Sequence, residues 1–172
     1  HLFSGVRAQD LSGIEPVLEE AGVKQPPAAR RAVLVGTDLS LSQTHVMPDG
    51  VHANTMWGVM AWQLLGKEGY SLVESADKAG VSPGSAVLRE LFAKASPCLI
   101  LIDEWVVFVR QLYGKDRTSL PAGSFEANLS FAQALTEAVK AVPGALLVAS
   151  IPSSDIEVGG EGAEAVRSEE HT

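Results

Sequence analysis

The sequence predicts an α/β protein built on an open, mostly parallel sheet with helices on both faces. Three apolar runs, at about residues 31–36, 98–103 and 145–150, have the length and composition of buried parallel strands. Between them lie segments whose apolar residues recur at helical spacing. Alternating strands and helices favour parallel pairing, because the chain must cross back over the sheet between consecutive strands.

Apolar spacing and the positions of Gly and Pro predict where the helices begin and end. Ile14, Val17, Leu18 and Ala21 form an apolar stripe, which predicts a short surface helix ending before Gly22. Further helices are expected at residues 55–65, 71–79, 105–113 and 125–141, and after Pro83. Residues 37–54 are polar and are expected to form a long loop.

Composition and charge narrow the class of protein. The chain has 172 residues, is 46% hydrophobic and carries a net charge of −8, which suits one folded domain and argues against a surface made to coat nucleic acid. Its one cysteine, Cys98, opens an apolar run and reads as a small buried thiol in a reducing compartment. No apolar run reaches the roughly 20 residues of a membrane span. We therefore expect a cytoplasmic protein without a membrane association.

The strongest chemical signal is the run from Leu99 to Glu104, four apolar residues followed by two adjacent acids. In P-loop enzymes, the first such acid holds a magnesium ion, usually through water, and the second orients or deprotonates the attacking water. This pattern predicts that Asp103 binds magnesium and that Glu104 is the catalytic base. The alternative is that the two acids merely begin the next helix, where negative charge is favourable.

Polar residues follow the other two strands as well. Gly36, Thr37 and Asp38 follow the first strand, and Ser150 ends the third. Because reactive groups gather at the carboxyl ends of parallel strands, Ser150 is the predicted sensor of a terminal phosphate, with Ser153 as the second candidate to contact the nucleotide. Equally, either serine could simply end a strand.

Other motifs are missing or weak. No Gly-x-x-x-x-Gly-Lys-Ser/Thr phosphate loop is present, since Gly66-Lys67 and Gly114-Lys115 are each followed by an acid. The glycine pattern at residues 160–165 lies well beyond a strand end and is expected to belong to a flexible polar tail at residues 159–172. His45 and His52 lack helical spacing and a third ligand, so a metal site there is not expected.

The chain resembles a prokaryotic domain-of-unknown-function family of large predicted ATPases of the AAA+ type, members of the P-loop class. The resemblance covers nearly the whole chain up to about residue 160. It is carried by the motifs His-Leu-Phe-Ser-Gly, Ala-Val-Leu-Val-Gly-Thr, Thr-Met-Trp-Gly-Val-Met-Ala-Trp-Gln-Leu, Leu-Ile-Asp-Glu, Gln-Ala-Leu-Thr-Glu-Ala-Val-Lys and Leu-Leu-Val-Ala-Ser-Ile-Pro-Ser-Ser-Asp. In that family, a Gly-Gly-Gly-Lys-Thr-His phosphate loop lies just upstream of the segment that resembles residues 1–5.

The resemblance implies a three-layer αβα ATPase core over residues 1–158 that lacks its phosphate loop. It implies that Asp103 is the magnesium-binding acid, Glu104 the base and Ser150 the sensor, with Mg²⁺ and ATP bound in the complete protein. It also implies that turnover remodels a protein or DNA partner, in the setting of phage defence. The 172-residue chain alone is expected to bind no cofactor and to be inactive, and to self-associate through the sheet edge at residues 145–150. The alternative is a non-catalytic interaction module with an ATPase-like fold.

Overall fold

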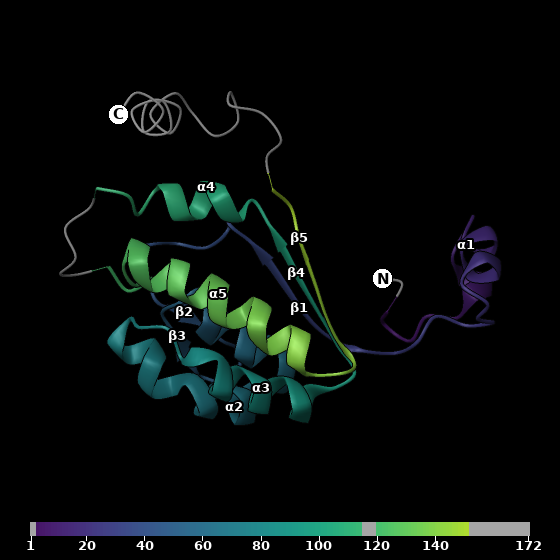
Figure 1. The fold of residues 1–172 in the computed structure, drawn as a ribbon, viewed down its shortest axis with the longest axis horizontal. Helices are drawn as coiled ribbons and strands as arrows, with labels where there is room; N and C mark the ends of the chain where they lie inside the picture. The colour runs from purple at the N-terminus through teal and green to yellow at the C-terminus, as the bar shows by residue number, and fades with distance from the viewer. Residues whose placement is uncertain (1–2, 115–119, 152–172) are drawn as a thin grey trace, which may run out of the picture.

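A three-stranded parallel sheet forms the centre of the molecule (Figure 1). The structure, a computed structural model, describes residues 3–114 and 120–151. The strands are β1 (Arg30–Val35), β4 (Cys98–Asp103) and β5 (Ala145–Ala149), in the order β1-β4-β5. Both neighbouring pairs are parallel, so the expected parallel sheet is confirmed, and β4, which ends at Asp103, is its middle strand.

Helices α2 (Met56–Ala79), α3 (Gly84–Ala95) and α5 (Phe125–Ala141) cover one face of the sheet (Figure 1). Alternate strand residues point into this layer and are fully or almost fully buried, among them Leu34, Ile100 and Ile102. The aromatic rings of Trp57 and Phe131 meet beneath them with centroids 5.3 Å apart. The core therefore lies between the sheet and a single layer of helices.

The expectation of helices on both faces is wrong for the described residues. On the opposite face, Val33, Leu146 and Val148 are 51%, 52% and 51% exposed. The strand order explains this arrangement, because both crossovers, from β1 to β4 and from β4 to β5, move across the sheet in the same direction. Two right-handed crossovers in the same direction place their helices on the same face.

Helix α2 is broken where the sequence predicts a helix end. Leu65 and Gly66 depart from helical dihedrals, and Gly66 has a φ of 60°. The second half continues directly to Ala79, rather than starting near residue 71, and Gly80 caps it in the left-handed conformation. The two predicted helices are therefore successive halves of one bent element.

A buried carboxylate joins the two ends of α2. Asp77 is fully buried and accepts hydrogen bonds from the backbone amides of Asn54 and Thr55, at 3.0 and 2.8 Å, and from the Thr55 hydroxyl, at 2.5 Å. The Tyr70 hydroxyl donates to the same carboxylate at 2.9 Å. Thr55 is also the N-cap of α2, so the start of the helix is fixed by a side chain near its end.

The loop predicted over residues 37–54 contains a short antiparallel hairpin, β2 (His45–Val46) and β3 (His52–Ala53). Helix α4 (Trp105–Arg110) is shorter than the predicted 105–113, since its last residues form a turn.

An N-terminal arm, residues 3–29, holds the 3-10 helix η1 (Ala8–Asp10) and helix α1 (Glu15–Glu20), which lie apart from the sheet in Figure 1. Of the helices in the described ranges, none combines the length and apolar character needed to cross a bilayer.

Candidate functional site

The carboxyl edge of the sheet brings together the polar residues that follow its three strands. The register pairs Val35 with Asp103, and the Ser150 amide donates to the Ile102 carbonyl at 3.0 Å, so the three strand ends lie side by side. Ile102 is buried, whereas Asp103 and Glu104 are both exposed. The two acids therefore avoid the desolvation penalty that burial at a strand end would impose.

Asp103 and Ser150, predicted from sequence to belong to one site, are in direct contact. The Ser150 hydroxyl donates a hydrogen bond of 2.5 Å to Oδ1 of Asp103. The Glu104 amide donates to the same Oδ1 at 2.9 Å and to the Ser150 oxygen at 3.1 Å. Among the described residues these bonds engage only one carboxylate oxygen of Asp103, so the position of the carboxylate is fixed while Oδ2 can still bind a ligand.

Glu104 has an unusual backbone conformation. It is the N-cap of α4 and has a φ of 53° and a ψ of 30°, the left-handed region that costs a non-glycine residue about 1 kcal/mol or more. This turn directs the Glu104 side chain toward the end of β1, so the two adjacent acids contact different residues. Asp103 faces Ser150, and Glu104 faces Thr37.

Thr37 is the site residue to which the sequence assigned no role. Its hydroxyl donates a short hydrogen bond to Oε2 of Glu104. The sequence placed Thr37 at the correct edge of the sheet but gave no reason to pair it with Glu104. The available signal was the position itself, a hydroxyl residue directly after the neighbouring strand.

Gly36 permits the close approach of the β1 and β4 ends. Its amide donates to the Asp103 carbonyl at 2.8 Å. A Cβ at this position would collide with the carbonyl oxygen of Glu104 and lie 3.0 Å from the Cβ of Phe108. The absence of a side chain at Gly36 therefore helps to set the geometry of Glu104.

The remaining predicted residues do not join this cluster. Ser153 and the tail at residues 159–172 lie outside the described residues. His45 and His52 lie on the paired strands β2 and β3. Across the described ranges, no three His, Cys, Asp or Glu side chains are grouped as direct metal ligands, so a cation at Asp103 would need water or a ligand to complete its shell.

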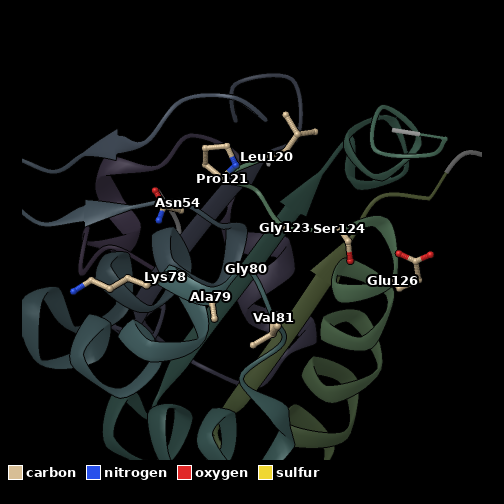
Figure 2. A pocket seen from close by; sticks show the side chains of 10 residues that line it. All are labelled: Asn54, Lys78, Ala79, Gly80, Val81, Leu120, Pro121, Gly123, Ser124 and Glu126. Atoms are coloured by element: carbon tan, nitrogen blue, oxygen red, sulfur yellow. The ribbon is translucent and has the colours of Figure 1, made fainter. Parts of the chain in front are cut away.

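A pocket of about 530 Å³ lies elsewhere, between the end of α2 and the start of α5 (Figure 2). Gly80 and Gly123 line its centre, and Lys78 and Glu126 lie at opposite ends (Figure 2). Its charged groups do not converge on one point, and none of the strand-end residues lines it. The pocket is separate from the acid cluster.

Cys98 behaves as an inert core residue. It is 2% exposed, and burial raises the pKa of its thiol, against a smaller opposing effect of Arg30. A raised pKa reduces the thiolate population, which disfavours a nucleophilic role for Cys98.

The fold and the site together define an α/β protein whose parallel sheet presents two carboxylates and two hydroxyls at its carboxyl edge. Residues 32–170, most of the chain, match the DUF499 N-terminal domain, and the chain belongs to this family. The expected membership of a family of unknown function is confirmed. No curated protein matches the chain.

Proposed function

We propose that this chain contributes the acid-bearing part of an ATP-hydrolysing core of the P-loop, AAA+ type, in which turnover remodels a protein or nucleic-acid partner. The observation that carries the proposal is the meeting of Thr37, Asp103, Glu104 and Ser150 at the carboxyl ends of three adjacent parallel strands. Ligands of open α/β sheets bind at this edge. The reducing environment suggested by a single buried cysteine fits a cytoplasmic protein.

Asp103 is the proposed magnesium-binding residue. A carboxylate at this position fits the ion, because Mg²⁺ prefers oxygen ligands and keeps several of its waters. It needs only one or two carboxylates when a nucleotide supplies phosphate oxygens. Bound there, a hydrated magnesium ion would neutralise charge on those oxygens. Ser150 and the Glu104 amide hold Oδ1 of Asp103, which leaves Oδ2 to accept a hydrogen bond from a water of the ion's shell.

Glu104 is the proposed general base. Its left-handed backbone directs the carboxylate away from the Asp103 oxygens, and Thr37 holds one of its oxygens. The other oxygen can accept a proton from a water molecule that attacks a terminal phosphate. The Ser150 hydroxyl, bonded to both Asp103 and the Glu104 amide, is placed to respond to the nucleotide through either acid.

Phosphate binding needs a part that this sequence does not contain. Backbone amides and the lysine of a Gly-x-x-x-x-Gly-Lys-Ser/Thr loop neutralise the phosphates in this class of enzyme. The proposal therefore applies to a longer chain that carries such a loop before residue 1. In that protein, Ser153 is the second residue proposed to contact the nucleotide.

The test compares two variants of that longer chain. Glu104→Gln removes the base but preserves size, so ATP should still bind while single-turnover hydrolysis falls by about 10² to 10⁴. Asp103→Asn should instead weaken the magnesium-dependent part of ATP affinity. Glu90→Gln, an exposed acid on α3, is the matched control and should change neither quantity.

Two results would contradict the proposal. If Glu104→Gln hydrolyses ATP at the parental rate, the acid pair merely begins α4. If the longer chain shows no magnesium-dependent nucleotide binding at all, the alternative of a non-catalytic interaction module is favoured.

A further inference from the structure

The open face of the sheet is an apolar surface with one basic end. Val33, Leu146 and Val148 are each about half-exposed on it. The register places Arg31 beside Leu99 on this same face, at the amino ends of the strands, and Arg31 is exposed. Parallel sheets are normally covered by helices on both faces, so a surface of this composition fits a covering element that is both apolar and acidic.

The N-terminal arm, residues 3–29, has that composition. Val17 of α1 and Val23 just after it are 53% and 43% exposed, although a helix of this kind normally buries its apolar stripe. Glu15, Glu19 and Glu20 lie on the same six-residue helix and are exposed. The arm therefore presents aliphatic side chains bordered by three carboxylates.

The arm does not cover the sheet of its own molecule. Figure 1 shows α1 beyond the amino ends of the strands, apart from the sheet. The arm keeps an internal order of its own, because the Ala29 amide donates to the Phe3 carbonyl at 3.1 Å and the Ala8 amide donates to the Gln25 side chain at 2.9 Å. In this position, the arm leaves the open face of its own sheet uncovered (Figure 1).

We propose that two copies of this chain exchange their arms, each arm covering the open sheet face of the other copy. Val17 and Val23 pack against Val33, Leu146 and Val148, and the carboxylates of α1 lie near Arg31 of the second copy. The exchange is reciprocal, as in a two-fold dimer, so both open faces are covered at once. This inference does not rest on the proposed nucleotide chemistry, because none of these residues belongs to the Asp103 site.

The experiment measures the dimer dissociation constant of the 172-residue chain by sedimentation equilibrium. Val148→Asp on the sheet and Val17→Asp on the arm should each raise this constant about tenfold or more, since each places a charge in an apolar contact. Leu129→Asp is the control, because Leu129 is 49% exposed but lies on α5, and it should leave the constant unchanged.

Reversing the charge of exposed residues tests whether the arm of one copy contacts the sheet of the other, without disturbing the buried core. Arg31→Glu alone, and Glu19→Lys with Glu20→Lys, should each weaken the dimer, and the combination of all three should restore it. A chain that is monomeric at every concentration overturns the proposal. So does a dimer that Val148→Asp disrupts but the arm variants do not, because another surface would then cover the sheet. The pairing of the arm with Arg31 would also be ruled out if the triple variant dimerised no more tightly than Arg31→Glu or the Glu19→Lys, Glu20→Lys pair.

Discussion

The Thr37 hydroxyl donates a hydrogen bond to Oε2 of Glu104, although 67 residues of chain separate the two. The bond links the loop after β1 to the acid after β4. It restrains a long side chain whose free rotation would otherwise separate it from the rest of the site. Two substitutions at Thr37 can therefore separate the effect of the hydrogen bond from that of side-chain volume.

Thr37→Val should lower single-turnover ATP hydrolysis by about tenfold or more in a longer chain that carries a phosphate loop, because a hydrogen bond to a charged group contributes about 1.5 to 3 kcal/mol. Thr37→Ser, which keeps the hydroxyl, should stay close to the parental rate. Nucleotide affinity should be similar in both variants. An equal loss of hydrolysis in Thr37→Ser, which keeps the hydroxyl, would show that the loss does not come from the hydrogen bond to Glu104.

The 172-residue chain alone should not turn over ATP. Its sequence has no phosphate loop, and Asp103 can meet a nucleotide only through a metal that the phosphates help to hold. Phosphate release from the purified chain should equal the background without protein. Release that Asp103→Ala abolishes would reveal a different phosphate site in this chain.

Gly36→Ala should destabilise the fold by roughly 1 to 3 kcal/mol, because the added methyl group would collide with the backbone of Glu104 in a packed region. Gly13→Ala meets no atom within 4 Å and should cost only about 1 kcal/mol for its positive φ. Urea unfolding measures both free energies. Equal losses would show that the β1 and β4 ends can separate without cost.

Asp77→Ala should lower the free energy of unfolding by about 3 kcal/mol or more. The substitution leaves three buried or partly buried donors, the Asn54 and Thr55 amides and the Thr55 hydroxyl, without their acceptor, whereas the Tyr70 hydroxyl keeps the His52 carbonyl at 2.8 Å. Glu74→Ala, which removes an exposed ion pair with Lys78, should cost less than about 1 kcal/mol. Chemical denaturation of the two variants gives the comparison directly.

Tyr70 should make the fold sensitive to alkaline pH. Desolvation, with further contributions from the hydrogen bond and the charge of Asp77, raises the pKa of Tyr70 well above its ordinary value of 10.0. A raised pKa means that the folded state favours the neutral phenol. The stabilising effect is complete below the unfolded pKa and is lost as the pH rises through about 10 toward the folded pKa. The free energy of unfolding should therefore fall above about pH 10, and Tyr70→Phe should flatten this part of the profile.

Continuous apolar runs identified β1, β4 and β5, because an apolar run of this length is too short for an ordinary helix and is typical of a buried strand. The boundaries predicted for α5, residues 125–141, match the structure, since Ser124 caps its start. The open face could not be predicted in the same way. A run such as that from Ala32 to Val35 implies burial on both faces, and the order of the strands decides which face the helices cover.

The position of the candidate site at the carboxyl edge of the sheet could be predicted from the sequence, but the hydrogen bonds within it could not. Asp103, Glu104 and Ser150 were recognisable because polar residues directly follow apolar strands. The left-handed backbone of Glu104 was not, since no local pattern forces a glutamate into that region. The bond to Thr37 depends on that conformation, so it could be recognised only once the backbone was known.

The break in α2 at Gly66 has a consequence for how the molecule folds. A straight helix of 24 residues would span about 36 Å, yet the Asp77 carboxylate lies within hydrogen-bonding distance of Thr55 at the opposite end. The bend therefore closes a loop of only 22 residues with contacts that need no strand of the central sheet. Contacts this close in sequence form at little entropic cost, so residues 54–77 should acquire protection from hydrogen exchange before the strands pair.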